Sequence, residues 1–407
     1  MNGRRDGDVG GHRSRGAGGR AARKPAPGIL LRRRSMTGGP GHVVEGRHEV
    51  GAGVADQSWD VIVVGAGVAG LCAATELVRA GRRVLVVDKG RGSGGRMATR
   101  RLGAAVFDHG AQFFTVRSRE FGDLVGAAEE AGAVTTWSDG FAHVAADGAI
   151  APAGDGHPRW RGVRGMTDLP KHLLATLESA MTAGRAAVRT AARVTALDSE
   201  GACARVTIDA GTNSAEILDA GGLILTPPVP QSLDLLAAAG TVLEPETRRL
   251  LESMRYDPCF ALMLVLDRPS LVPAPGAIQF DAAAAGPVAW LADNQQKGIS
   301  VLPALTVHAG GRFSRDYFEA PPDEVMDLLV AAVRPWIDGD PATAVVERSL
   351  HRWKFALPTT VIPAPFVAVG TAPPIVCCGD AFAGPRVEGA ASSGLAAGRW
   401  MAGALSP

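Results

Sequence analysis

Three glycines and one aspartate carry the clearest chemical signal in the sequence. Gly65, Gly67 and Gly70 form a Gly-x-Gly-x-x-Gly motif, and Asp88 follows 18 residues after the last glycine. Such glycines let backbone N–H groups approach a pyrophosphate, and an acidic side chain at this spacing can accept hydrogen bonds from a ribose. The pattern predicts a dinucleotide site. An ordinary glycine-rich turn is the alternative.

The motif requires a strand before it and a helix after it. The run 60–65 has the β-branched composition of a buried parallel strand, and apolar residues at helical spacing predict a helix over 68–80. A second buried strand is predicted over 83–88. Together these elements make a βαβ unit whose helix N-terminus faces the phosphates. A Rossmann-type domain is therefore expected.

Two further segments favour FAD over a nicotinamide dinucleotide. The loop 89–101 is rich in glycine and arginine, and Arg91 and Arg96 can bridge phosphate oxygens. Near the C-terminus, Asp380 follows a buried strand and precedes a helix predicted over 389–404. The positive end of that helix could face the flavin edge that becomes anionic on reduction. FAD is therefore the expected cofactor.

The middle of the chain is less regular and shows no internal repeat. Helical periodicity predicts helices over 169–183 and 322–333, and an amphipathic stretch covers 231–254. The remaining predicted strands cover 188–197, 204–209, 222–226, 260–266, 277–280, 344–353 and 374–379.

Four segments resemble the FAD-dependent amine-oxidase superfamily and, within it, the bacterial renalase-like branch: 60–77, 90–101, 107–115 and 379–390. The resemblance covers about residues 57–407. It implies an α/β fold in which a Rossmann-type FAD-binding domain carries an inserted antiparallel-sheet substrate domain, an arrangement like that of p-hydroxybenzoate hydroxylase. No cysteine motif for covalent attachment is found, so FAD is expected to be non-covalent.

The resemblance also assigns residues to the parts of FAD. It implies that the glycine motif holds the pyrophosphate, that Asp88 holds the adenosine ribose, and that Gly110–Gln112 lie near the isoalloxazine ring. Val194 falls on the adenine side, and three C-terminal residues fall at the ribityl and pyrimidine end. The expected FAD contacts are Gly65, Gly67, Val68, Ala69, Gly70, Asp88, Lys89, Arg91, Gly95, Arg96, Met97, Gly110, Ala111, Gln112, Val194, Asp380, Val387 and Glu388.

The expected domain organisation is discontinuous. Residues 1–50 carry a net charge of +7 and the remaining residues −6, and the composition of 1–56 predicts a disordered basic extension. The FAD-binding domain is expected over 57–118, 163–230 and 367–407, and the substrate domain over 119–162 and 231–366.

The resemblance implies an FAD-dependent oxidase that takes a hydride from a small reduced donor, such as a dihydronicotinamide, onto flavin N5, with oxygen as acceptor. A flavin amine oxidase or desaturase and a non-catalytic flavin-binding protein are the alternatives. The catalytic residues are not identified. The candidates are His109, Lys297, Trp290 and Trp353, for which a turn histidine, a surface lysine and core tryptophans are the competing interpretations.

Composition argues against several other classes of protein. The five cysteines are scattered without metal-ligand spacing, which favours a reducing cytoplasm and no metal. The mildly acidic body argues against nucleic acid as a partner. No apolar run is long enough to span a bilayer. The sequence leaves the oligomeric state open.

Overall fold

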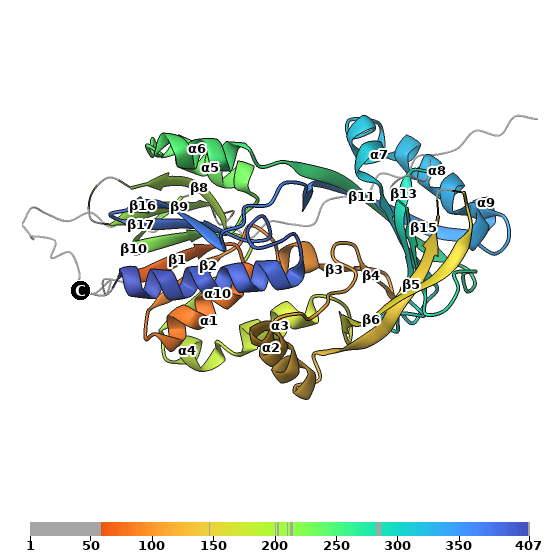
Figure 1. Ribbon diagram of the computed structural model, residues 1–407, viewed down its shortest axis with the longest axis horizontal. Coiled ribbons are helices and arrows are strands. Elements are labelled where there is room, and N and C mark those ends of the chain that lie inside the picture. The colour runs from red at the N-terminus through yellow and green to blue at the C-terminus, as the bar shows by residue number, and fades with distance from the viewer. Residues whose placement is uncertain are drawn as a thin grey trace, which may run out of the picture. The chain divides into compact units, whose positions relative to one another are not determined.

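The computed structural model describes residues 58–405, except 146, 200, 202, 210, 212–214 and 282–285. The predicted basic extension lies outside the described residues. Those that are described belong to one compact unit, which is built around two large sheets (Figure 1).

The first sheet has eight strands and contains the predicted βαβ unit. Its central strands are parallel and almost wholly buried, as their β-branched composition requires. The order along the sheet is β16-β17-β10-β1-β2-β7, and β9 pairs with β10 and with β8. The strands are β1 (Trp59–Val64), β2 (Val84–Val87), β7 (Ala186–Arg189), β8 (Arg193–Asp198), β9 (Ala204–Asp209), β10 (Glu216–Leu225), β16 (Phe366–Thr371) and β17 (Pro374–Cys378).

Two helices, α1 (Val68–Arg79) and α10 (Val387–Ala404), pack together along this sheet (Figure 1). Their close approach depends on glycine in α10. A Cβ atom added to Gly394 would lie 2.0 Å from the carbonyl oxygen of Ala69 in α1. The small-residue composition of the C-terminal helix is therefore a packing requirement.

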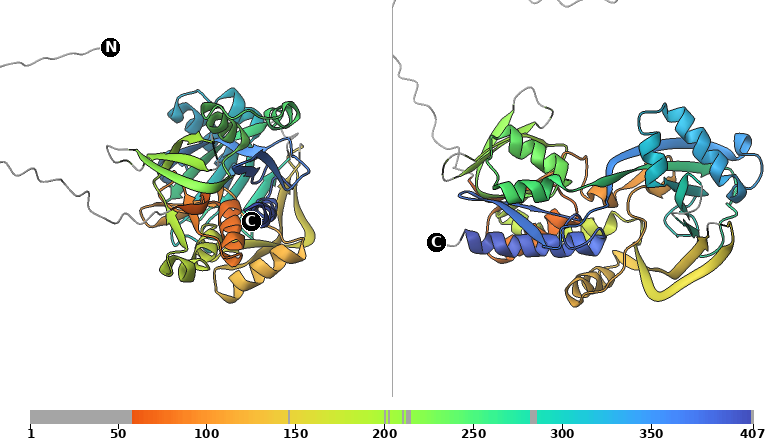
Figure 2. Two further views of the ribbon diagram at one scale, coloured as in Figure 1. Left: turned by 90° about the vertical axis from the view of Figure 1, so that its left-hand side faces the viewer. Right: turned by 45° about the horizontal axis from the view of Figure 1, so that its top comes forward.

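The second sheet has seven strands and lies under helices on one face. In β11 and β14, alternate side chains such as Leu262 and Val307 belong to one buried cluster with apolar side chains of α8, while the intervening residues point to the opposite face. Figure 2 shows the cyan helices α7 and α8 on the sheet. The order is β15-β11-β14-β13-β12-β5-β6, antiparallel except at β12–β5. The strands are β5 (Val134–Val144), β6 (Ile150–Gly162), β11 (Tyr256–Leu266), β12 (Ala277–Phe280), β13 (Val288–Asp293), β14 (Ala304–Ala309) and β15 (Val345–Pro358).

A short hairpin, β3 (Thr99–Leu102) with β4 (Ala105–Asp108), packs on the helix-free face of the seven-stranded sheet. Phe107 is fully buried there with Met263 of β11. The other helices are α2 (Arg119–Glu130), α3 (Asp168–Ala175), α4 (Glu178–Thr182), α5 (Val229–Ala238), α6 (Pro245–Glu252), α7 (Gly311–Asp316), α8 (Pro322–Val333) and α9 (Pro341–Ala344), with 3-10 turns at Gly95–Met97 and Arg334–Trp336. No helix among the described residues is long and apolar enough to cross a membrane.

Most of the predicted elements are confirmed, but several strands were not predicted, among them β5, β6, β13, β14 and β16. The single helix expected over 169–183 is divided into α3 and α4. The strand expected over 188–197 is interrupted at Ala191, whose φ of 52° turns the chain between β7 and β8. The apolar side chains of α5 and α6 join the core of the eight-stranded sheet, whereas the second part of the substrate domain was expected to begin at 231.

Candidate functional site

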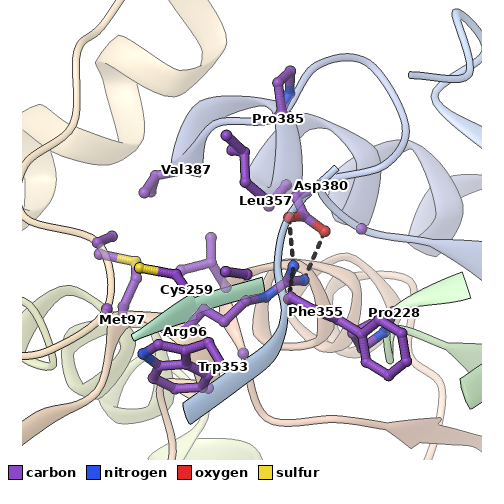
Figure 3. Close-up of a pocket in the computed structure, with 18 of the residues that line it drawn as sticks. Arg96, Met97, Pro228, Cys259, Trp353, Phe355, Leu357, Asp380, Pro385 and Val387 are labelled. Carbon is purple, nitrogen blue, oxygen red and sulfur yellow. Dashed lines mark hydrogen bonds and ion pairs between the residues drawn. The ribbon is translucent and has the colours of Figure 1, made fainter. Parts of the chain in front are cut away.

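A cavity of about 1540 Å³ extends from the carboxyl ends of β1 and β2 to the helix-free face of the seven-stranded sheet. Figure 3 shows part of its wall. Pockets for a single small ligand measure roughly 300–1,000 Å³. This cavity therefore has room for a dinucleotide together with a second molecule.

The glycine motif forms one end of the cavity, and each glycine has a distinct role. Gly65 has φ 109°, a left-handed conformation that turns the chain out of β1. A Cβ atom on Gly67 would meet nothing within 4 Å, and this residue lines the cavity. A Cβ atom on Gly70 would lie 1.9 Å from the Gly65 carbonyl oxygen. The turn, the open approach and the tight packing that a pyrophosphate site needs are all present.

Asp88 lies beside this turn because Val64 and Val87 are paired at the ends of β1 and β2. Its carboxylate accepts hydrogen bonds from the backbone N–H groups of Ala66 and Gly90, each at 2.6 Å. A carboxylate has about four acceptor positions, so Asp88 can still accept from a ribose at the cavity wall. The cradle therefore fits an adenine dinucleotide.

Arg96 and Asp380 form a bidentate ion pair in the cavity wall (Figure 3). Both N···O distances are 2.6 Å, and the pair joins residues 284 positions apart. Arg96 also donates to the carbonyl oxygen of Phe355 at 3.3 Å. Its guanidinium group is thus oriented by the strand end that carries Asp380, a contact that was not anticipated from the sequence.

All but four of the predicted FAD contacts line the cavity. Gly70 serves helix packing, and Arg91 is exposed. Gln112 is buried, and its amide donates to the carbonyl oxygens of the neighbouring turn. Glu388 accepts from the backbone N–H of Ser118 at 2.6 Å, so its carboxylate caps the start of α2. The contacts seen for these four residues are with the protein itself or with solvent, and their FAD contacts stay predictions.

The sheet presents a row of rings to the cavity. Trp290 of β13 is paired with His308 of β14, and Ala261 of β11 is paired with both His308 and His351 of β15. Paired residues lie on the same face of a sheet, so the row crosses four strands of the seven-stranded sheet on one face. Trp353 lies two residues beyond His351 in β15. Three of the four candidate catalytic residues, His109, Trp290 and Trp353, line the cavity.

His109 is held against this row by ring contacts. It stacks on Trp353 with ring centroids 5.3 Å apart and meets His351 edge-on at 4.9 Å. The indole N–H of Trp353 donates to the His109 carbonyl oxygen at 2.8 Å. The position of His109 is therefore fixed from two sides.

The three cavity histidines are neutral at pH 7. Burial, reinforced by repulsion between the protonated forms of His109 and His351, lowers the pKa of His109 to about 4. Burial also lowers the pKa of His308 to about 4, although a hydrogen bond with the His109 backbone acts to raise that pKa. Burial lowers the pKa of His351 as well. These side chains therefore act as neutral hydrogen-bonding groups and not as cations.

These shifts predict a pH-dependent stability. The folded-state pKa of His109 and His308 lies below the unfolded value of about 6.5, so the unfolded chain binds protons first as the pH falls. We expect the free energy of unfolding to decrease between about pH 6.5 and pH 4, by up to about 3 kcal/mol per histidine. Urea unfolding of the apoprotein across this range, compared with His308→Gln, measures it. An identical slope in both proteins would contradict the assignment to His308.

Lys297 is not the surface lysine that the sequence suggested. It is fully buried outside the cavity lining, with its Nζ 2.6 Å from Asp108 Oδ2 and 2.6 Å from the carbonyl oxygen of Gln112. Asp108 and Lys297 are 189 positions apart. No local pattern could have revealed this contact.

Phe113 and Phe141 were not anticipated from the sequence, and together with the candidate residue Trp290 they form an aromatic wall. Their ring centroids lie 5.0–5.5 Å apart, and all three residues line the cavity. The strand that contains Phe141 was not predicted, because its large apolar residues Val134, Trp137, Phe141 and Val144 do not alternate with polar ones.

The carboxylates among the described cavity residues lie away from this aromatic wall or are paired. Asp88 and Asp234 belong to the dinucleotide end, where Gln231, one turn before Asp234, accepts from Lys89. Asp257 is paired with Arg315, and Asp380 with Arg96. In the described part of the chain, no group of acidic, histidine and cysteine residues has a metal-binding arrangement.

Comparisons with known proteins agree with this geometry. A family model described as flavin-containing amine oxidoreductase matches residues 119–399, and one described as NAD(P)-binding Rossmann-like domain matches residues 63–127. Among solved structures, cyclohexylamine oxidase from Brevibacterium oxydans IH-35A is similar, with TM-score 0.60, 14% identity, and coverage of 85% of this chain and 99% of that chain.

Two further solved structures share the fold. Putrescine oxidase bound to putrescine has TM-score 0.59 and 14% identity, with coverage of 85% of this chain and 98% of that chain. A proposed protoporphyrinogen oxidase from Exiguobacterium sp. 255-15 has TM-score 0.62 and 14% identity, with coverage of 84% and 97%. At 14% identity the similarity shows a shared fold, and it does not assign the substrates of those proteins to this chain.

Proposed function

Because the chain belongs to the flavin-containing amine oxidoreductase family and is an FAD-dependent oxidoreductase, we propose that it oxidises a small, uncharged, reduced ring compound. A dihydronicotinamide is the model donor, and oxygen is the proposed electron acceptor. We also propose that the chain belongs to the renalase-like branch of the superfamily and acts in the cytoplasm. We further propose that the chain has a p-hydroxybenzoate-hydroxylase-like fold, in which α5 and α6 belong to the FAD-binding domain.

FAD, when bound, supplies the hydride-accepting ring. The residues proposed to hold it are those of the expected set that line the cavity: the glycine turn and Asp88 at the adenosine end, and Gly110 and Ala111 at the ring. Arg96 and Asp380, already paired, would bind the ribityl and phosphate region together. The protein positions the donor against the flavin and excludes water from the site.

The charge of the aromatic wall is the observation that carries the choice of donor. Phe113, Phe141 and Trp290 are uncharged, and His308 and His351, which share their sheet face, have lowered pKa values. No carboxylate among the described residues lines this wall without an arginine partner. A protonated amine would therefore lose its water of hydration without gaining a counter-charge. An uncharged ring would stack there without that cost.

Two buried polar atoms suggest how such a ring is oriented. Trp290 Nε1 and His109 Nδ1 have no hydrogen-bond partner among the described residues, and both residues line the cavity. Buried polar groups are rarely left unpaired. We propose that a carbonyl or amide oxygen on the donor accepts from Trp290 Nε1.

An amine oxidase remains the second candidate, because aromatic faces also attract ammonium groups. Anaerobic mixing of the purified holoenzyme with dihydronicotinamide isomers and with primary amines separates the two candidates. We expect flavin bleaching by the dihydronicotinamides alone. Bleaching by amines alone would establish the amine oxidase, and bleaching by neither would indicate a flavin-binding role.

Trp290→Phe provides a matched variant for this experiment. It retains the ring and removes the indole N–H, so we expect about a tenfold rise in KM for the donor. An unchanged KM would contradict the hydrogen bond proposed for Trp290.

A further inference from the structure

We infer that Lys297 is a positioning residue, which fixes the segment 108–112 from the side opposite the cavity so that Gly110 and Ala111 are presented to the flavin. This inference rests on the proposed function, because it assigns that segment to the isoalloxazine ring. Lys297 does not line the cavity, so its effect must pass through its hydrogen bonds. We call 108–112 the flavin-facing segment.

The Asp108 side chain ties the start of this segment to three parts of the fold. Lys297 donates to Oδ2 at 2.6 Å, while the Thr99 hydroxyl and the Met166 backbone N–H donate to Oδ1 at 2.6 and 2.8 Å. The ion pair is completely inaccessible, with both side chains 0% exposed. Asp108 therefore connects the β3–β4 hairpin to the segment before α3 and to the turn after β13 of the seven-stranded sheet.

The carbonyl groups of the segment are held from the same side. Lys297 donates to the Gln112 carbonyl oxygen at 2.6 Å, and the Gln112 side-chain amide donates to the carbonyl oxygens of Asp108 and Gly110 at 2.6 and 3.0 Å. The Thr306 hydroxyl also donates to the Asp108 carbonyl oxygen, at 3.1 Å. Three alternate carbonyl groups are thus fixed, which sets the orientation of the peptide planes between them.

The other side of the segment leaves little freedom. The N–H of Ala111 donates to the Arg96 carbonyl oxygen at 2.8 Å. A Cβ atom on Gly110 would lie 1.9 Å from the same oxygen. The segment is therefore held between the Arg96 loop and the Lys297 network, and displacement of either side would move the residues proposed to face the flavin.

Lys297 is itself rigidly placed. Its backbone N–H donates to the Asp293 carbonyl oxygen at 2.9 Å, and the Asp293 side chain accepts from the N–H groups of Gln295 and Gln296. Its ammonium group lies 4.7 Å from the ring centroid of Trp137, which packs on Phe141 of the aromatic wall. One side chain therefore links the flavin-facing segment to the proposed donor site.

Stability alone gives little reason for such a pair. Apolar side chains of similar volume are often as stabilising as a buried ion pair, because desolvation offsets much of the attraction. The specific gain from a lysine here is a set of directed hydrogen bonds to one carboxylate and one carbonyl oxygen. That gain is geometric, and a displacement of about 1 Å in an active site can cost 100-fold in rate.

The test uses Lys297→Met, which retains the side-chain length and removes the charge and its donors. In the apoprotein we expect hydrogen exchange of the peptide amides in 108–113 to accelerate at least about tenfold. In the holoenzyme we expect a shifted visible flavin spectrum and a kcat about 10- to 100-fold lower, with KM for the donor changed less than about threefold. Unchanged exchange, spectrum and kcat would overturn the inference.

A double variant separates positioning from simple charge neutralisation. Lys297→Met leaves Asp108 as an unpaired buried charge and could unfold the protein, whereas Lys297→Met with Asp108→Asn buries no charge and retains an acceptor for Met166. We expect the thermal midpoint to recover in the double variant while fast exchange and low kcat persist. Recovery of all three would show that Lys297 only neutralises Asp108.

Two comparisons make the result specific. Lys171→Met, at an exposed lysine of α3, should leave exchange in 108–113, the flavin spectrum and kcat unchanged. If the proposed donor is wrong, the flavin of the wild-type holoenzyme will not be bleached by any dihydronicotinamide. The exchange and spectral measurements need no donor, so they test Lys297 independently.

Discussion

Replacing Gly67 by aspartate is expected to abolish FAD binding in a protein that still folds. Gly67 is the N-cap residue of α1 with φ −77°, a conformation open to any residue, and a Cβ atom there would meet nothing within 4 Å. The new carboxylate would therefore extend into the cavity, where the helix N-terminus and the glycine turn are proposed to receive a pyrophosphate.

The size of the effect follows from electrostatics. Two unit charges about 4 Å apart repel by about 4 kcal/mol at an effective dielectric constant of about 20. A repulsion of that size raises the FAD dissociation constant about 1,000-fold. Flavin fluorescence titration of the apoprotein measures the constant, and circular dichroism with a thermal midpoint shows whether the fold is retained.

Gly126→Asp supplies the matched control for Gly67→Asp. Gly126 lies in α2, outside the cavity lining, and also has open space where a Cβ atom would be placed. FAD affinity should be unchanged in that variant. A Gly67→Asp protein that retains its yellow colour through dialysis would refute the assignment of the pyrophosphate site.

Replacing Gly394 by valine is expected to destabilise the whole unit. The Cβ atom would lie 2.0 Å from the carbonyl oxygen of Ala69, 2.7 Å from its carbonyl carbon and 2.8 Å from its Cα. All three are backbone atoms of α1, so no flexible side chain can move aside. The two helices must separate, at a cost at or above the upper end of the 1–3 kcal/mol typical of overpacked cores, about 3 kcal/mol or more.

The consequence extends to the cofactor site. The first residues of both helices, Val68 of α1 and Val387 of α10, line the cavity, so a change in helix spacing displaces two of its walls. We expect the thermal midpoint of Gly394→Val to fall by roughly 5 °C or more and its FAD affinity to fall as well. Calorimetry of the apoprotein and flavin titration measure the two effects separately.

The control for Gly394→Val lies in the same helix. A Cβ atom on Gly403 would meet nothing within 4 Å, so Gly403→Val introduces the same side chain into α10 without a clash. Its thermal midpoint should remain close to that of the wild type. Equal destabilisation by the two variants would show that helix propensity, and not the contact with α1, is responsible.

Local patterns in the sequence identified the elements at both ends of the unit. The strand before Gly65, the helix after Gly67 and the strand before Asp380 were predicted close to their observed bounds. Each depends on a short run of residues whose own composition favours one conformation, as β-branched runs favour buried strands. The family resemblance then connected these ends into one cofactor site.

Contacts between distant residues were not predictable in the same way. Arg96 was expected to reach phosphates, and nothing in the sequence indicated that its guanidinium would also pair with Asp380, 284 positions away. Lys297 was interpreted as a solvated side chain because lysine is rarely buried, and it is fully buried against Asp108. The apolar run of β11 indicated a strand without indicating which of its alternate side chains would face helices and which the cavity, and β14 was not predicted.

The sequence by itself therefore determined the glycine turn, the acidic residue beside it, the return of the C-terminal segment and the family. These depend on residues close together in the chain, where backbone conformation and side-chain periodicity are local properties. The tertiary structure alone decided that His109, Trp290 and Trp353 share a cavity, that its histidines are neutral and that Lys297 lies behind the flavin-facing segment. Burial and pairing depend on which faces the two sheets bring together, and that is a property of the packed chain.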